Sequence, residues 1–453
     1  MTDILKSLFH AWEFLLLELS SCLPSDSGLS RQMLQVTQQC LTANLASQGP
    51  ETIFVRIVNA RANMSLTLAQ RLAGSSPSAS DANQLLGTLF AVINSIDEPF
   101  AFESIAYYRT LLKTLYVTLR AYTEGEKKLA AEGKSGASGQ IVAVTQTVLG
   151  LLDRVVARGF RRLVTLIHDS EASVSPEDLV LLTAILQASL AVPNIDQCQT
   201  QIHNIIASHD AMHVATSLFS WADKLADNGD PIYGELSLLF LLELSTLPRL
   251  AEQLACDGLL GQLTSANLAN FMRRSTISPF ADAIGPQRCY SIWAKGMLPL
   301  LLNMLTALGA TIAPEVAYVL NQFPHLLKSS VDRFEAPGAS RTASVAQGTA
   351  SQYITLLAVS EAHSLALITR VLAAFRANNN RDTPEVEWDA AGMLENIDFW
   401  LSGRKLLRER LLPLGQRELD WRNTRVGDEG NKLEERAVVQ LECVRDVLSE
   451  GLE

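Results

Sequence analysis

A pair of apolar stripes in residues 287–334 constrains the fold of the chain more than any other feature. In the first half of this segment, apolar side chains recur at steps of three and four and so share one wide face of a helix. They are Trp293, Met297, Leu300, Leu301, Met304 and Leu308. Gly309 predicts the end of this helix, and Pro314 suits the first turn of a second one that lasts until Pro324. A connection of about five residues predicts an antiparallel hairpin, whose other apolar faces need neighbouring hairpins to cover them.

The same segment resembles a known family. The run IWAKGMLPLLLNML followed by APEVAYVLNQF, within residues 288–323, is similar to the C-terminal part of the largest helical scaffold nucleoporins of the nuclear pore inner ring. Within that group it resembles nucleoporin one-eighty-eight more than its paralogue, nucleoporin one-ninety-two. Outside this segment, the chain shares only a general helical pattern with these proteins. Because these proteins are much longer than 453 residues, the resemblance implies a C-terminal fragment.

Composition and periodicity predict an all-α protein. Apolar residues make up 48% of the chain and charged residues 19%, which excludes a disordered chain. Helical patterns follow one another, and no alternating run is long enough for a sheet. Consecutive hairpins recur about every 40 residues, which suits a right-handed solenoid of stacked antiparallel hairpins of the HEAT or armadillo type. Since no consensus residue repeats with them, an irregular helical bundle is the alternative.

Two polar connections predict the domain boundaries. Residues 124–139 are rich in glycine, lysine and serine and predict an exposed linker, and residues 336–350 predict a flexible loop. The expected parts are therefore N-terminal hairpins (1–123), central hairpins (140–335) and C-terminal helices (351–453). The first helix has an unusually apolar face, which predicts the cut end of a longer solenoid. The face consists of Leu5, Leu8, Phe9, Trp12 and Leu16.

Charge and cysteine usage restrict the compartment and the partners. Six cysteines without paired spacing indicate a reducing compartment, the cytosol or the nucleus. A net charge of −11 argues against nucleic acid as a general partner. The longest uncharged run, Gly296 to Pro314, is nearly long enough to cross a bilayer, but Pro299 and Asn303 lie within it. The helical hairpin explains the same residues, so no membrane span is expected.

Residues that could carry chemistry are few. One cluster combines ligand types close in sequence, namely Cys198, His203, His209 and His213. Its spacing matches no established zinc pattern, and isolated polar residues at helix ends are the interpretation that we favour. Gly133-Lys134-Ser135 has the end of a phosphate-binding loop, but Lys128 stands where such a loop needs glycine. With no catalytic motif in the sequence, we expect no enzyme, no metal and no cofactor.

Several surface features could bind a partner. Three tryptophans and a phenylalanine crowd the last quarter and could line a groove for a partner's helix, although core packing is the alternative. They are Trp388, Phe399, Trp400 and Trp421. Two basic stripes could dock an acidic segment or could simply be solvated helix faces. They consist of Arg154, Arg158, Arg161 and Arg162, and of Arg404, Lys405, Arg408 and Arg410. Residues 341–344 also resemble a basic-directed phosphorylation site.

The resemblance implies a structural protein of the nuclear pore complex in the nucleus. Such a scaffold would bind other nucleoporins, chiefly linker segments of the nucleoporin ninety-three class, and would support protein and mRNA transport indirectly. The sequence contains no Phe-Gly dipeptide, so it is not a repeat-bearing barrier protein. The alternative is a soluble, importin-like transport receptor, which would also be an acidic helical solenoid.

Overall fold

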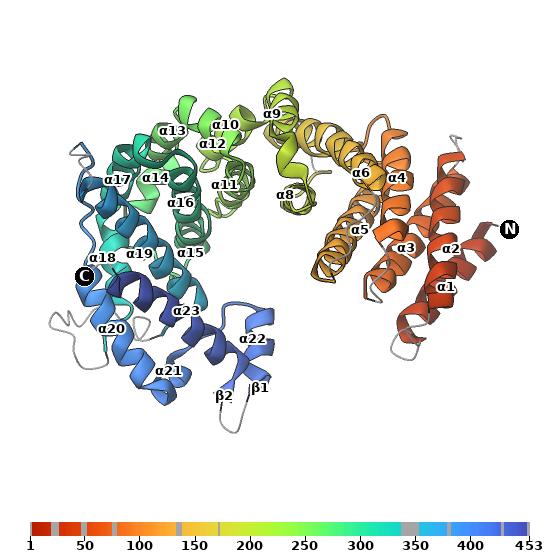
Figure 1. Cartoon of the computed structure of the whole chain (residues 1–453). Helices are drawn as coiled ribbons and strands as arrows, with labels where there is room; N and C mark the ends of the chain where they lie inside the picture. The colour runs from red at the N-terminus through yellow and green to blue at the C-terminus, as the bar shows by residue number, and fades with distance from the viewer. Residues whose placement is uncertain are drawn as a thin grey trace. The chain divides into compact units, whose positions relative to one another are not determined.

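The computed structural model describes residues 2–19, 27–46, 52–74, 79–132, 138–170, 173–336, 353–377, 382–426 and 430–450 (Figure 1). Over these residues helices dominate, with a short antiparallel ribbon of two strands, β1 (Arg425–Val426) and β2 (Gly430–Asn431). The predicted all-α class is therefore confirmed. The chain divides into two compact units, unit 1 (Met1–Val214) and unit 2 (Ala215–Glu453).

Unit 1 is a series of helices that pack mainly on helices one or two places away in the sequence, as in a solenoid. Thus α3 contacts α1, α2 and α5, and α4 contacts α2, α5 and α6 (Figure 1). The helices are α1 (Thr2–Leu19), α2 (Ser27–Ala46), α3 (Thr52–Gly74), α4 (Ala79–Asn94), α5 (Ile105–Ala131), α6 (Ser138–Leu151), the π-helix η1 (Leu152–Ala157), α7 (Arg158–His168), α8 (Pro176–Leu190), the 3-10 helix η2 (Ile195–Cys198) and α9 (Gln199–Ser208). The next helix, α10 (Ala211–Trp221), spans the boundary between the units.

The core of unit 1 follows the predicted spacing. On α5, Leu111, Leu115 and Leu119 recur every fourth residue and are fully buried. Helix α5 continues to Ala131, into the segment predicted as a linker. The reason is that this part consists largely of good helix formers, and Arg120 forms an ion pair with Glu124 one turn later at 3.1 Å. Residues 133–137, including the Gly-Lys-Ser sequence, lie outside the described residues.

Unit 2 is built around the predicted hairpin. Helix α16 ends at Leu308, and Gly309 adopts a left-handed φ of 59° that favours glycine. Pro314 lies in the first turn of α17, and Phe323 is fully buried ahead of Pro324. Trp293, Leu300 and Met304 are fully buried on the first stripe, so the two predicted helices and the turn at Gly309 between them are confirmed, and their antiparallel packing on each other stays a prediction.

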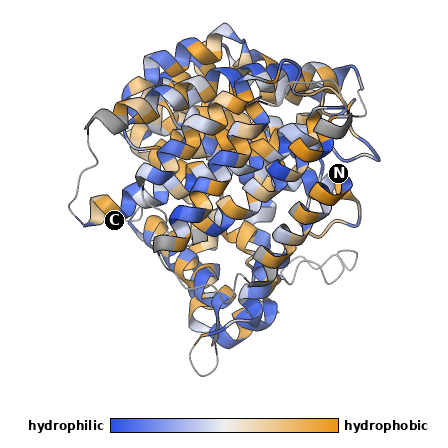
Figure 2. Cartoon of the chain, turned by 90° about the vertical axis from the view of Figure 1, so that its right-hand side faces the viewer, coloured by the Kyte–Doolittle hydropathy of each residue, from blue (hydrophilic) through white to orange (hydrophobic). Residues whose placement is uncertain are grey.

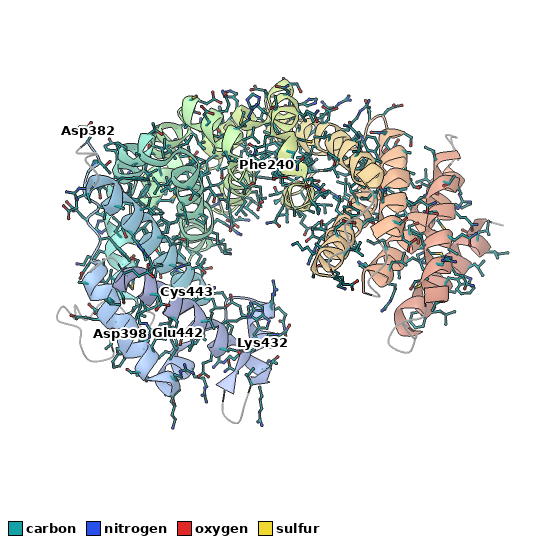
Figure 3. The ribbon with its side chains drawn as sticks, viewed as in Figure 1. Phe240, Asp382, Asp398, Lys432, Glu442 and Cys443 are labelled. Carbon is teal, nitrogen blue, oxygen red and sulfur yellow. The ribbon has the colours of Figure 1, made fainter. Side chains whose placement is uncertain are left out.

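The other helices of unit 2 cover this hairpin. Helix α19 packs on both α16 and α23, and α11 packs on α12 and α16 with Phe240 fully buried (Figure 3). The elements are α11 (Ile232–Ser245), α12 (Pro248–Cys256), α13 (Leu259–Ser265), α14 (Asn267–Met272), α15 (Ile284–Ser291), the π-helix η3 (Ile292–Met297), α16 (Leu298–Leu308), the 3-10 helix η4 (Gly309–Thr311), α17 (Ala313–Asn321), α18 (Pro324–Asp332), α19 (Leu356–Ala377), α20 (Ala390–Ser402), α21 (Arg404–Arg410), α22 (Gln416–Asn423) and α23 (Lys432–Ser449). Hydrophilic and hydrophobic residues alternate along single helices, as helices with one covered face require (Figure 2).

Two π-helical turns interrupt otherwise continuous helices. In η3, the N–H of Leu298 donates to the carbonyl of Trp293, five residues earlier, instead of to a carbonyl four residues earlier. Pro299 follows directly, and it has no N–H and would clash with a carbonyl in a regular helix. The wider turn lets the helix pass the proline without breaking. In η1, the backbone N–H of Arg158 donates to the backbone carbonyl of Asp153 in the same way, and no proline is nearby.

Several predictions about the domain organisation of the chain stay predictions. Most of the 336–350 loop and all of residues 341–344 lie outside the described residues, and the three-part division of the chain is not tested. On the first helix, Leu8 and Trp12 are each 51% exposed, and the side chains of Phe9 and Leu16 are outside the described set. The idea of a cut end at this face therefore remains a prediction.

Within the described ranges, two helical stretches are long and apolar enough to cross a membrane by length and composition. They are Ile284–Thr311 and Leu356–Ala377, and the bent pair Pro176–Leu190 and Ile195–Ser208 would be a third if it formed one span. In each of the first two, about half of an apolar window of 18 residues, 56% and 50%, is buried inside the protein. The second stretch also contains Glu361, a fully buried carboxylate with protein partners. Packing between helices thus explains much of their apolar composition.

Candidate functional site

The structure divides the four predicted partner-binding aromatic residues into two pairs. Trp388 and Trp400 lie in the core of unit 2, with exposed fractions of 8% and 2%. The Nε1–H of Trp388 donates to Ser330 Oγ at 3.0 Å, and that of Trp400 donates to the carbonyl oxygen of Phe334 at 2.7 Å. Buried indole N–H groups need such acceptors. These two side chains therefore hold helices together.

The other pair reaches the surface. Phe399 is 37% exposed and packs edge-on against Trp400, with ring centroids 5.3 Å apart. Trp421, on α22, is half-buried, and the guanidinium groups of Arg417 and Arg436 lie 4.8 Å and 3.9 Å from its ring centroid. Helix α22 packs on α23, whose first residue, Lys432, is labelled in Figure 3. Phe399 and Trp421 are thus the two predicted residues that a partner could touch directly.

A buried polar cluster joins three helices of unit 2 around Glu361 on α19. Its carboxylate is fully buried and forms an ion pair with Arg333, which directly follows α18. The hydroxyl of Tyr290 donates to the same carboxylate at 2.7 Å, and the Nε1–H of Trp293 donates to it at 2.9 Å. Because each strong donor faces an acceptor, the cluster stabilises the packing of α15, η3 and α19 and leaves no free reactive group.

The environment of this cluster shifts its pKa values. Burial, reinforced by the Glu361 carboxylate, raises the pKa of Tyr290 well above its ordinary value. Burial alone would lower the pKa of Arg333, but Glu361 and Tyr290 outweigh burial, so the pKa of Arg333 rises. Tyr290 thus stays neutral and Arg333 stays charged, as the ion pair requires.

A second cluster fixes α15 to α11. The guanidinium of Arg288 donates to both carboxylate oxygens of Asp230, at 2.9 Å and 3.0 Å, and also pairs with Glu235. Ser291 donates to the other oxygen of Glu235 at 2.6 Å. Hydrogen bonding to Asp230, opposed by burial, raises the pKa of Arg288. This cluster is also internal and structural.

The two predicted basic stripes differ in how they are paired. On α21, Arg408 forms an ion pair with the nearly buried Glu434, and Arg404 lies 3.7 Å from Glu442, which is labelled in Figure 3. In unit 1, Arg154, Arg158 and Arg162 are exposed, and none has an ion-pair partner among the described residues. The α21 stripe therefore helps to hold α23, whereas the stripe in unit 1 remains open to solvent.

The open stripe lines the larger of the two grooves described below. This groove in unit 1 has a volume of about 740 Å³ and lies between the α4–α5 connection and the helix formed by η1 and α7. Besides Arg154, Arg158, Arg161 and Arg162, its walls include Asp97, Glu98 and Phe102. We call it the arginine groove. A groove of about 540 Å³ in unit 2, between α19, α20 and α23, is lined by alanines and by charges that pair with each other, such as Arg370 with Glu450.

The cysteine and histidine cluster does not converge. His209, which follows α9, faces Asp153 with its Nε2 atom 2.8 Å from the carboxylate. Cys198 ends η2, and His213 lies in α10. Among the described residues, no group of three or more histidine, cysteine, aspartate or glutamate side chains is placed to hold a metal ion. His209 instead contacts Asp153, the acidic residue that directly precedes the basic stripe.

Comparisons with known proteins agree on one family. The family profile for the nuclear pore protein NUP188 C-terminal domain matches residues 85–448. A curated relative, nucleoporin NUP188 of Chaetomium thermophilum, is 53% identical over 99% of this chain and 26% of its own length. Nucleoporin nup184 of Schizosaccharomyces pombe is 26% identical over 53% of this chain and 14% of its own length. The chain thus spans about a quarter or less of these relatives.

A solved structure gives the same answer. The fragment Nup188(aa1445-1827) from Myceliophthora thermophila superposes with a TM-score of 0.71 at 58% identity, covering 81% of this chain and 98% of the fragment. The predicted resemblance, including the choice between the two paralogues, is confirmed, and so is the location at the nuclear pore complex of the nuclear envelope. The chain belongs to the nucleoporin NUP188 family and corresponds to its C-terminal domain.

Proposed function

We propose that the chain is a structural, non-enzymatic scaffold of the nuclear pore inner ring, which binds other nucleoporins and supports nucleocytoplasmic transport indirectly. The observation that carries this proposal is the use of buried charge in unit 2. Glu361 and Arg333 are both largely buried, and every contact they make is to a helix of the same unit. Groups of this kind fix the positions of helices, which a scaffold needs over its whole length.

The proposed partners are linker segments of the nucleoporin ninety-three class. A partner helix that lies on a helical scaffold needs exposed aromatic anchors. Phe399 and Trp421 supply such surface, and Trp388 and Trp400 support the helices beneath. We therefore propose Phe399 on α20 and Trp421 on α22 as two contact points for the partner, with Trp388 and Trp400 holding α20 in place beneath Phe399.

Affinity purification of the tagged chain from nuclear extract tests this proposal. We expect inner-ring nucleoporins, including the ninety-three class, in the wild-type sample and a loss of the ninety-three class with Phe399→Ala combined with Trp421→Ala. Phe271→Ala is a matched control, because Phe271 is 39% exposed and also stacks against an arginine, with Arg274 4.4 Å from its ring centroid. Recovery of cargo together with the GTPase Ran would instead support the importin-like alternative.

A further inference from the structure

We infer that the arginine groove of unit 1 binds a short acidic peptide segment that carries an aromatic or aliphatic side chain. This inference rests on the proposed function in one respect only, that the chain is a binding protein. The groove uses none of the aromatic residues proposed above, and its lining residues all lie in unit 1.

The positive wall of the groove is a regular row of charges. Arg154, Arg158 and Arg162 follow one another at steps of four along η1 and α7, so their guanidinium groups lie on one side of the helix. Like charges at this spacing repel each other. Within the described residues none of the three forms an ion pair with a carboxylate, and an acidic partner would reduce the repulsion. Arginine is also suited to bidentate recognition of carboxylates.

The acid next to this row has another partner. Asp153 directly precedes Arg154 in the sequence, but its carboxylate lies 2.8 Å from Nε2 of His209. Arg161 makes only a long contact of 3.5 Å to the carbonyl oxygen of His209. The charge of the stripe therefore remains available on the side that faces the groove.

The opposite wall supplies an apolar anchor. Phe102, in the α4–α5 connection, is 85% exposed, which is the highest exposure among the large apolar side chains of the described residues. Next to it, Phe100 is buried and packs edge-on against Tyr108 at 5.4 Å, which fixes the base of the connection. An exposed aromatic ring on a fixed base suits an apolar contact with a bound segment.

The acids in the groove favour a peptide over nucleic acid. Asp97 and Glu98 are exposed on the same wall as Phe102. A continuous phosphate backbone would place negative charge against them, whereas a peptide can present backbone N–H groups on that side and carboxylates to the arginines. Charge complementarity on one wall and an apolar contact on the other thus define the occupant.

Fluorescence anisotropy with the whole chain tests this inference. The probe is a fluorescein-labelled peptide, EEDFEELEED, with KKKFKKLKKK and a ten-nucleotide oligouridine as comparisons. We expect saturable binding of the acidic peptide, about tenfold weaker binding for Arg158→Glu combined with Arg162→Glu, and about fivefold weaker binding for Phe102→Ala. Raising the salt concentration should weaken wild-type binding as well.

A matched charge reversal outside the groove is the control. Lys405→Glu combined with Arg422→Glu changes the net charge equally at exposed positions of unit 2 and should leave the affinity within about twofold. Because Arg158 and Arg162 are exposed, their variants should retain the wild-type circular dichroism spectrum. Absence of acidic-peptide binding, equal loss with the control variant, or tighter binding of oligouridine would each overturn the inference. Recovery of inner-ring nucleoporins is a separate readout, so either proposal can fail alone.

Discussion

The two units use arginine in opposite ways. In unit 2, Arg288, Arg333 and Arg408 each pair with a carboxylate that is at most 8% exposed, and these pairs connect helices that are far apart in the sequence. In unit 1, the row Arg154, Arg158 and Arg162 faces solvent. Unit 1 also has an internal pair, Arg109 with Asp178 at 2.6 Å. Unit 2 therefore uses these arginines within the fold, whereas unit 1 uses one arginine in this way and presents a row of others that a partner could bind.

This comparison separates two roles that look identical in a sequence. A buried ion pair adds directional contacts that only one arrangement of helices satisfies, but it is costly to break. An exposed unpaired row adds almost nothing to stability and is available for binding. Stability measurements on substitutions in the two units should therefore differ sharply, and the following predictions run from the largest effect to the smallest.

Removing the carboxylate at the centre of unit 2 should have the largest effect. Glu361→Ala leaves the buried Arg333 without a counter-charge and should lower the free energy of unfolding by about 3–5 kcal/mol. Urea unfolding followed by tryptophan fluorescence measures this, since five of the six tryptophans lie in unit 2. Glu385→Ala, which breaks the exposed pair with Arg376, should cost at most about 1 kcal/mol. Similar losses in both variants would contradict the distinction.

Glycine substitutions should show how closely each unit is packed. At Gly296, in η3, an added Cβ would lie 2.6 Å from Leu238 Cδ2 and 3.0 Å from its Cγ, so Gly296→Ala should destabilise the chain by about 1–3 kcal/mol. At Gly87, inside α4, nothing lies within 4 Å, and Gly87→Ala should stabilise it by about 0.5–1 kcal/mol. Urea midpoints give both values, and effects of the same sign would refute this contrast.

Alkaline pH should lower the free energy of unfolding of unit 1, because burial makes two of its tyrosines harder to ionise in the folded state. Burial raises the pKa of Tyr107 and of Tyr122 to about 12 each. In the unfolded chain these groups ionise near pH 10, so between pH 10 and 12 the unfolded state binds fewer protons and stability falls as pH rises. The expected loss is about 1 kcal/mol per tyrosine at pH 11, and it should be absent below pH 9. Tyr122→Phe should reduce the pH dependence, measured by urea unfolding at each pH, and an unchanged slope would argue against burial as the cause.

The exposed arginine row should give the smallest change in stability. Arg158→Ala combined with Arg162→Ala removes charges that have no partner among the described residues, so the free energy of unfolding should change by no more than about 0.5 kcal/mol. Within this range the relief of repulsion at a spacing of four residues acts in the stabilising direction. Thermal unfolding monitored by circular dichroism gives the value. A loss of about 2 kcal/mol or more would assign these residues a structural role within the fold.

Local sequence signals predicted the hairpin of unit 2 and several helix starts. Gly309 and Pro314 act on the backbone of their own neighbourhood, and the apolar stripes need only helical periodicity. The sequence Ser175-Pro-Glu-Asp also predicts a helix start from neighbouring residues alone, and in the structure Ser175 and Asp178 form a capping box there. Features of this kind can be found without knowing which segments meet in space.

Other features depend on distant partners and could not be predicted in that way. Glu361 is separated by 68 and 71 residues from Trp293 and Tyr290. Nothing near Arg158 or Arg408 in the sequence reveals that the first is unpaired and the second is engaged. The short helices α13, α14 and α22 and the β1–β2 ribbon have too few residues for a clear period, so the sequence alone does not reveal them. The burial of Trp388 and Trp400 beside exposed Phe399 likewise follows from tertiary packing.

The wide turn in η3 also affects how the protein can tolerate changes in length. A π turn holds one residue more than the regular spiral needs, so this stretch already stores an extra residue without a break in the rod. Deleting a single residue there would restore ordinary winding and leave the later side chains of α16 on their present sides, whereas the same deletion within the regular part of α16 would rotate every side chain after it by about 100° about the helix axis. The side of α16 that now meets α19 would thus survive a one-residue deletion at the wide turn and would be turned away by one further along the rod, so the wide turn is where this helix best tolerates a change in length.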